Sequence, residues 1–279
     1  MNRQPRDKRR AGVKIRLTTR DESLVRAVAR FRIADTASLI RVCFEGIRRD
    51  TAVRRLRLLY DAGWLDLKVP GRDRENLYLL GPGGRRWIEG KGGAAAGPPR
   101  GSIEHHLGIV RAWATIASHG IPGLEVARTY PDWELREKLG AAGSELVPDL
   151  FVTFRAEGPS VPLAVEVDLG TESLRTLTDK VRRYAQLRGD PSGLFGARDF
   201  ALGFALGDGH RGRHIRALLD QEWRGWSLVW GDPSEFSLAF RGVLASILPP
   251  LSASPYGKGS SSIATAGPST GSDRDDAGL

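Results

Sequence analysis

Three acidic residues lie in what reads as a pair of neighbouring β-strands. Asp149 stands in the run Val-Pro-Asp-Leu-Phe-Val-Thr-Phe, and Glu166 and Asp168 stand in the run Leu-Ala-Val-Glu-Val-Asp-Leu-Gly-Thr. A hairpin that turns at 157–160 places Asp149 almost opposite Glu166, and opposed side chains share one face of a sheet. The two-residue period puts all three acids on that face and the apolar side chains on the other.

Carboxylates this close to each other repel, so such a pair tends to persist where a cation or a basic side chain holds it together. Carboxylate oxygens, a main-chain carbonyl and water are ligands that suit Mg²⁺ or Mn²⁺. The pair Asp149 and Glu166 therefore predicts a divalent-metal site. The alternative is an edge hairpin whose acidic face is solvated, because edge strands carry charges that prevent aggregation.

Further candidate residues lie in the flanking segments. The helix expected after the hairpin carries Lys180 beside its apolar stripe and Tyr184 four residues later, on the same face. The Lys180 amine could reach over the two carboxylates from the side, or it could bridge Asp168 or Glu172 at the surface. His105, at the start of another expected helix, is a candidate for a position near the carboxylates or at the substrate, against the alternative of a buried structural histidine.

The order of these residues resembles that of known nucleases. Pro148-Asp149 followed by Glu166-Val-Asp168, between two helices, resembles the core of the PD-(D/E)XK nucleases. A wider set of motifs, within roughly residues 22–230, resembles the bacterial replication-relaxation family, which is associated with plasmids and other mobile elements. These motifs are Glu104-His105, Trp133-Glu134, Val147-Pro-Asp149, Glu166-Val-Asp-Leu-Gly-Thr-Glu172 and Lys180-Val-Arg-Arg-Tyr184.

The nuclease resemblance implies a role for each position. Asp149 and Glu166, with the main-chain carbonyl after Glu166, would hold a metal that polarises the scissile phosphate and lowers the pKa of the attacking water. Glu134, expected at the end of the preceding strand, would add a ligand or support one. Asp168 stands where the nuclease pattern has its lysine, and an acid cannot neutralise the phosphate. Lys180 would replace that lysine, a migration that the nuclease superfamily tolerates.

An α/β framework is expected to position these residues. Three strands in a meander, then a strand reached through a helix, predict a restriction-endonuclease-like α/β sandwich with a mixed sheet. The expected helices are 102–119, 172–188 and 210–223, and the expected strands are 124–134, 147–154, 161–169, 200–206 and 227–230.

The first third of the chain predicts a winged helix. Helical spacing at 22–31, 36–44 and 50–63 is followed by two short strands at 64–69 and 76–80. The third helix would enter a DNA major groove. Its Arg54 and Arg57, with Arg72 and Arg74 of the hairpin, would lie near phosphates, which position a protein without choosing a sequence. The alternative is a domain that contacts protein and whose arginines form a solvated face.

The net charge of +9 is concentrated at the start of the chain. Residues 1–90 hold 22 Lys and Arg against 11 Asp and Glu, whereas residues 91–279 hold 20 against 22. Residues 1–20 alone, including Arg9 and Arg10, carry a net charge of +7. This pattern is typical of a mobile arm that follows the phosphates of double-stranded DNA, or of a tail that aids solubility.

Composition also predicts how the chain is divided. A Gly- and Ala-rich stretch and a Ser-, Gly- and Pro-rich end are typical of a linker and a disordered tail. The predicted order is a disordered basic arm at 1–20, the winged helix at 21–90, a linker at 91–101, the nuclease-like domain at 102–248 and the tail at 249–279. The chain lacks both the run of ~18 apolar residues that crosses a membrane and a secretory signal, so a cytoplasmic location is expected.

These patterns together support two functional hypotheses. The first is a DNA-binding protein of plasmid or mobile-element replication or relaxation, with a metal-dependent site that hydrolyses DNA phosphodiesters and with replication or mobilisation proteins as partners. The second is a non-catalytic regulator or replication accessory factor that keeps the nuclease fold as a binding platform. Lys180 pointing at Asp149 and Glu166 favours the enzyme, whereas Lys180 bound to Asp168 alone favours the platform. A third possibility is a protein–protein adaptor.

Overall fold

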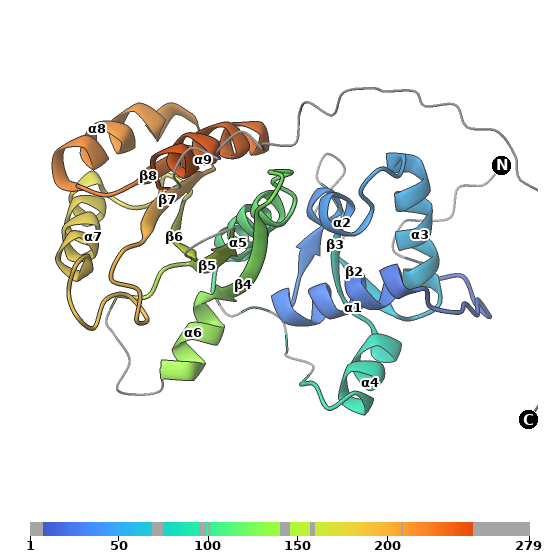
Figure 1. Ribbon diagram of the computed structural model, residues 1–279. Helices are drawn as coiled ribbons and strands as arrows, with labels where there is room; N and C mark the ends of the chain where they lie inside the picture. The colour runs from blue at the N-terminus through green and yellow to red at the C-terminus, as the bar shows by residue number, and fades with distance from the viewer. Residues whose placement is uncertain are drawn as a thin grey trace, which may run out of the picture.

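The computed structural model describes residues 8–68, 75–94, 97, 99, 101–139, 146–156, 160–207 and 209–247. The chain forms two parts that pack against each other, with helix α5 between them (Figure 1). The first part is mainly helical with a small sheet, and the second is an α/β sandwich built on a larger sheet.

The first part has the three helices and two strands that the sequence predicts, together with one further strand, β1, and one further helix, α4. Its three-stranded sheet has the order β1-β3-β2, and all of its pairs are antiparallel. The additional strand, β1, has two residues and pairs with β3. The elements are α1 (Thr19–Phe31), β1 (Ala34–Asp35), α2 (Thr36–Cys43), α3 (Arg49–Asp61), β2 (Leu65–Lys68), β3 (Leu77–Leu80) and α4 (Pro82–Gly90).

Polar side chains fix where these helices begin. Thr18 and Asp21 form a capping box at the start of α1, in which each side chain accepts a bond from the main-chain N–H of the other. The buried Asp21 carboxylate also pairs with Arg55 of α3, so the same residue caps one helix and ties it to another. Asp35 caps α2, because its Oδ1 accepts the Ser38 main-chain N–H at 2.8 Å.

The described residues of the predicted arm lie against the first part instead of extending from it. Arg9 donates to the Leu65 carbonyl at 2.8 Å, pairs with Asp66 at 3.0 Å and lies over the Tyr60 ring. The main-chain N–H of Arg10 donates to Asp61 at 3.1 Å. Partners on α3 and β2 thus hold Arg9 and Arg10 against the first part, in a stretch that the sequence analysis assigned to a disordered arm.

The second part is a mixed sheet between two layers of helices. Its five strands have the order β4-β5-β6-β7-β8, antiparallel from β4 to β6 and parallel from β6 to β8, which confirms the predicted fold class. The elements are α5 (Ile103–Ala117), β4 (Glu125–Pro131), α6 (Asp132–Leu139), β5 (Leu150–Arg155), β6 (Val161–Asp168), α7 (Leu174–Leu187), β7 (Ala201–Leu206), a short 3₁₀ helix (Gly209–Arg211), α8 (Gly212–Glu222), β8 (Ser227–Trp230) and α9 (Pro233–Ile247).

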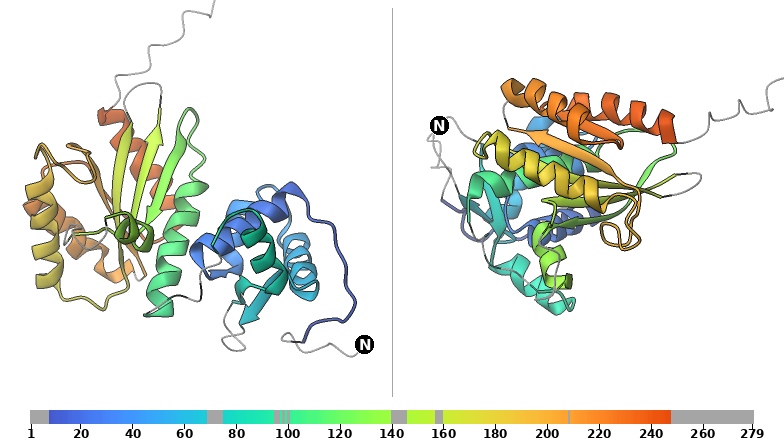
Figure 2. Two further views of the ribbon diagram at one scale, coloured as in Figure 1. Left: turned by 90° about the horizontal axis from the view of Figure 1, so that it is seen from below. Right: turned by 90° about the vertical axis from the view of Figure 1, so that its left-hand side faces the viewer.

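Each face of this sheet has its own hydrophobic core. Helices α5 and α9 cover one face, and α7 and α8 cover the other (Figure 2). The alternation along β5 and β6 follows this division: Leu150 and Val165 belong to the first core, and Phe151 and Ala164 to the second. The described helices include none that is long and apolar enough to span a membrane.

Two elements of the second part differ from the sequence prediction. Strand β4 ends at Pro131, and Asp132 begins helix α6, so the expected strand to residue 134 is three residues too long. Helix α9 was not expected, although Phe236, Phe240 and Val243 have helical spacing and pack in the core under the sheet.

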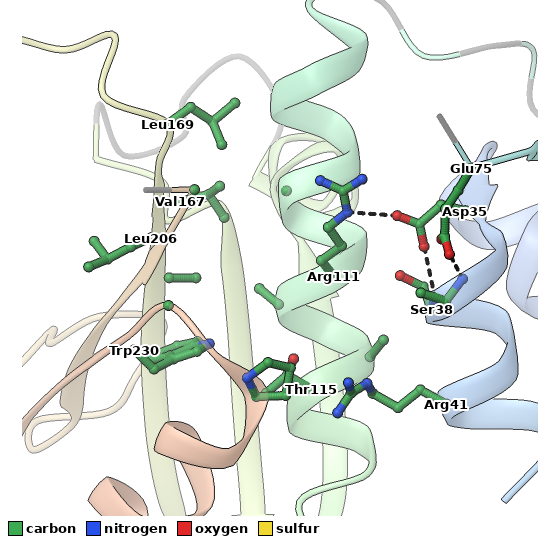
Figure 3. Close-up of a pocket in the computed structure, with 18 residues that line it drawn as sticks. Asp35, Ser38, Arg41, Glu75, Arg111, Thr115, Val167, Leu169, Leu206 and Trp230 are labelled. Atoms are coloured by element: carbon green, nitrogen blue, oxygen red, sulfur yellow. Dashed lines mark hydrogen bonds and ion pairs between the residues drawn. The ribbon is translucent and has the colours of Figure 1, made fainter. Parts of the chain in front are cut away.

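The contact between the two parts combines apolar packing with ion pairs. Phe31 at the end of α1 lies against Trp113 of α5, with ring centres 4.2 Å apart. Figure 3 shows Arg111 of α5 reaching Asp35 at the start of α2, where Nε and Oδ2 are 2.6 Å apart. This ion pair borders a cavity of about 390 Å³ between α2, α5 and the carboxyl ends of β6, β7 and β8. An apolar core and charged contacts therefore both hold the two parts together.

Candidate active site

The hairpin of β5 and β6 brings Asp149 and Glu166 together as predicted. Leu150 pairs with Val165 across the two antiparallel strands, so one further step of the same register sets Asp149 opposite Glu166. Asp149 is the residue immediately before β5, and its main-chain carbonyl accepts the Asp132 N–H at 3.0 Å. The predicted turn at 157–160 lies almost wholly outside the described residues.

Two donors hold the Asp149 carboxylate. Its Oδ2 accepts the main-chain N–H of Val167 at 2.7 Å, and its Oδ1 lies 3.0 Å from His105 Nε2. His105 is in the first turn of α5, which begins where the Ser102 hydroxyl accepts the His105 N–H. The hydrogen bond to Asp149 raises the pKa of His105, and this outweighs the opposing effect of partial burial. The structure thus brings His105 into contact with the predicted acidic pair.

Glu166 is buried, with a residue exposure of 2%. Its Oε2 accepts a hydrogen bond from the Lys180 amine at 2.7 Å, and its Oε1 accepts one from the Tyr184 hydroxyl. Burial raises the pKa of Glu166 to about 8, and repulsion from Asp149 acts in the same direction, while Lys180 and Tyr184 act against it. Glu166 is therefore a carboxyl group that can take up a proton near neutral pH.

Helix α7 positions Lys180 and Tyr184. Leu177, Val181 and Tyr184 are buried on one face of the helix, and Lys180 lies at the margin of that face. Burial lowers the pKa of the Lys180 amine, but the carboxylates of Glu166 and Asp149 outweigh it, and the net shift is upward. Lys180 thus points at the acidic pair, with Glu172 as a second and more distant partner at 3.8 Å.

Asp168 has a different partner, which sequence analysis missed. Arg211, just before α8, forms an ion pair with it in which Nε and Oδ2 are 3.1 Å apart, although the two groups lack the alignment of a hydrogen bond. The main-chain N–H of Gly170 donates to its Oδ1 at 3.0 Å. Because Asp168 is buried, Arg211 offsets a charge that would otherwise be costly. Lys180 therefore does not have to neutralise Asp168.

Glu134 does not join this group. It lies on α6, not at the end of a strand, and its carboxylate binds the Arg30 guanidinium through two contacts of 2.7 and 2.8 Å. Arg30 belongs to α1, so this ion pair connects the two parts of the molecule. The expectation that Glu134 supplies or supports a metal ligand placed it at the end of a strand, whereas β4 ends at Pro131 and Glu134 lies on α6.

The arginines predicted to contact DNA have different surroundings. Arg54 on α3 is exposed. Arg57 instead pairs with the buried Asp61 on the same helix at 3.0 Å. Arg72 and Arg74 lie outside the described residues. Of the predicted contacts on the third helix, Arg54 is thus the side chain that faces solvent.

A cleft of about 470 Å³ opens beside the acidic pair. Asp149, His105 and Lys180 line it, whereas Glu166 lies behind them. Within the described residues, no three His, Cys, Asp or Glu side chains are grouped around a common metal position. The two carboxylates are nevertheless chemically suited to bind a divalent cation, because each oxygen has a lone pair that its present hydrogen bond does not use. Such a cation would take its remaining ligands from the main chain, water or substrate.

Comparisons with known proteins support one of the two families that the sequence motifs resemble. No curated protein matches the chain. A solved structure of the restriction endonuclease FokI is similar with a TM-score of 0.35 and 13% sequence identity, over 81% of this chain and 44% of that one, so this chain spans less than half of its length. The sequence model of the replication-relaxation family matches residues 25–197, which include the acidic hairpin and α7. The chain belongs to the replication-relaxation family.

Proposed function

We propose that this protein binds double-stranded DNA through its first part and hydrolyses a DNA phosphodiester at the acidic pair, with Mg²⁺ or Mn²⁺ as cofactor, in plasmid or mobile-element replication. The observation that carries the proposal is the convergence of acidic and basic groups beside one cleft. Lys180 lies 2.7 Å from Glu166, and His105 lies 3.0 Å from Asp149. Lys180 contacts the acidic pair, and Asp168 is paired with Arg211. This position of Lys180 favours an enzyme over a non-catalytic binding platform.

The side chains have distinct tasks in this proposal. A bound cation would neutralise charge on the phosphate and make water a better nucleophile. The Val167 N–H orients Asp149 so that its carboxylate borders the cleft. The Lys180 ammonium, at the cleft wall, attracts the phosphate, and the neighbouring acidic groups, Asp149 among them, raise the pKa of the amine so that it stays charged. His105 holds a proton that it can exchange with solvent, because 43% of its side chain is exposed.

The first part supports the DNA-binding half of the proposal. Its element order, α1-β1-α2-α3-β2-β3, is the order of a winged helix, in which α3 would enter the major groove. The exposed Arg54 on α3 and the surplus of Lys and Arg in residues 1–90 favour contact with phosphates. Membership of the replication-relaxation family supports a role in replication, with replication proteins as partners.

A nicking assay tests the catalytic half. Supercoiled plasmid is incubated with Mg²⁺ or Mn²⁺ and with wild type, Asp149→Asn, Lys180→Met or the control Asp220→Asn, which alters an exposed acid on α8. Wild type and control should nick the plasmid, and the two site variants should be slower by about a hundredfold or more, as is typical when a charge-stabilising group is lost. Equal nicking by Asp149→Asn and wild type would remove the hairpin from the mechanism.

One observation favours the non-catalytic alternative. All four oxygens of Asp149 and Glu166 already accept bonds from protein donors, so the pair can be stable as a structural cluster. A binding platform would bind DNA in EDTA as tightly as in Mg²⁺, with an affinity that falls steeply with salt, and would nick no substrate. Fluorescence anisotropy with labelled duplex DNA, performed beside the nicking assay, distinguishes the two functions.

A further inference from the structure

A second and larger cavity adjoins the cleft on the other side of His105. It has a volume of about 1000 Å³ and lies between the end of α1, the first turns of α5 and α6, and the segment after β6. Asp132 and Arg136 line both cavities, as His105 does. A molecule that occupies the cleft at Asp149 can therefore extend past His105 into this second cavity.

Arg32 in the wall of this cavity has an unusual backbone and an unpaired donor. Its φ is +64°, a left-handed conformation that is costly for a residue other than glycine and that recurs at functional sites. Its guanidinium carbon lies 5.5 Å from the centre of the Trp133 ring. Its Nε is buried and has no hydrogen-bond partner among the described residues. A buried N–H without an acceptor is destabilising, and a ligand in the cavity would remove that cost by drawing the Arg32 guanidinium towards its own acceptor.

The other walls of the cavity suit a nucleotide. Arg136 adds a second guanidinium, balanced in part by Asp132 at 3.4 Å. Ile109 and Leu169 provide apolar surface for a sugar or base, and Thr171 provides a hydroxyl. Guanidinium groups recognise phosphate through paired N–H donors. One phosphate with an attached sugar and base matches this mixture better than a purely apolar molecule does.

We infer that this cavity binds one nucleotide of the DNA strand, next to the phosphate that Lys180 attracts at the cleft, and that Arg32 donates to the phosphate of that nucleotide. The inference rests on the proposed function because it assigns both cavities to one strand. His105 then stands between two successive nucleotides, so that the strand passes from Lys180 on one side to Arg32 on the other.

Calorimetry with thymidine 3′,5′-bisphosphate tests the inference on the full chain in EDTA. Arg32→Asn removes the guanidinium while keeping a residue type that tolerates a positive φ, so the fold should persist, which a thermal melt checks. The matched control is Arg155→Asn, an exposed arginine at the opposite end of β5 from Asp149. Wild type and control should bind equally, and Arg32→Asn should bind about tenfold more weakly or worse.

Two results would overturn the inference. One is equal binding of the bisphosphate to Arg32→Asn and wild type. The other is binding of inorganic phosphate as tight as that of the bisphosphate, which would mark a simple anion site. Because EDTA removes divalent cations, the measurement does not depend on hydrolysis. Nucleotide binding by wild type without plasmid nicking would support the nucleotide site in the cavity and refute the hydrolase. Plasmid nicking by wild type, together with equal binding of the bisphosphate to wild type and Arg32→Asn, would support the hydrolase and refute the role of Arg32.

Discussion

Replacement of Glu166 by glutamine tests the electrostatics of the acidic pair most directly. Glutamine keeps the size of the side chain and can still bond to Lys180 and Tyr184, but it cannot ionise. Burial raises the pKa of Glu166 from 4.5 to about 8 in the folded protein. Between these pH values the unfolded chain has lost the Glu166 proton and the folded chain retains it. The stability that Glu166 contributes is therefore full below pH 4.5 and falls as the pH rises towards 8.

The size of this effect follows from the difference between the two pKa values. Where the folded state binds one proton more than the unfolded state, the free energy of unfolding falls by about 1.4 kcal/mol for each unit by which the pH rises. Over the full interval this amounts to about 5 kcal/mol. Glu166→Gln lacks this dependence, so the free energy of unfolding of wild type relative to the variant should fall by about 1.4 kcal/mol per unit across the middle of the range.

Urea unfolding followed by tryptophan fluorescence, at about pH 5.5, 6.5 and 7.5, measures this difference. The control is Glu172→Gln, which removes a carboxylate that also lies near Lys180 but whose side chain is 43% exposed. Its difference from wild type should be nearly independent of pH. A flat profile for Glu166→Gln as well would show that Lys180 and Tyr184 keep Glu166 ionised in the folded protein, and would refute the reasoning from burial.

Two further predictions concern packing and the contact between the two parts. Gly108→Ala should destabilise the protein by about 1–3 kcal/mol, because a Cβ at this position would lie 2.5 Å from Val167 Cγ1. Gly242→Ala on α9 should stabilise the protein by up to about 1 kcal/mol, because a Cβ there meets no atom within 4 Å and alanine favours a helix. Thermal unfolding of the two variants tests both predictions. Asp35→Ala should cost about 1–2 kcal/mol because it removes both the cap of α2 and the partner of Arg111. Arg111→Ala should cost less, because the Ser38 N–H still bonds to the Asp35 carboxylate. Equal losses of the two variants in urea unfolding would contradict the capping role.

The acidic hairpin could be predicted from the sequence because its register depends on local features. Apolar residues alternate along both strands, and the turn between them is short, so the pairing of Asp149 with Glu166 follows from counting. The helical period likewise set Lys180 and Tyr184 on one face of α7. Glu134 was misplaced because Asp132, which begins α6, was read as part of the strand, although Asp is a common residue at the start of a helix.

Contacts between distant segments could not be predicted in this way. Arg211 meets Asp168 across 43 residues of chain, and only the parallel pairing of β6 with β7 brings the two near each other. Arg9 packs on Tyr60 and Asp66, partners that a charge count cannot reveal. A run of arginines near the start of a chain therefore indicates basicity but does not distinguish a mobile arm from a segment that binds the protein itself.

Arg211 also bears on Asp168, the acid that stands where the resemblance to nucleases led us to expect a lysine. Glu166 and Asp168 lie on the same face of β6, and both are buried, so two cations are needed if both are to ionise. Lys180 comes from α7 and meets Glu166, while Arg211 comes from the segment before α8 and meets Asp168. Because Arg211 neutralises Asp168, the Lys180 amine is left at the wall of the cleft beside Asp149. An aspartate at residue 168 is thus compatible with a lysine that serves the acidic pair from another helix.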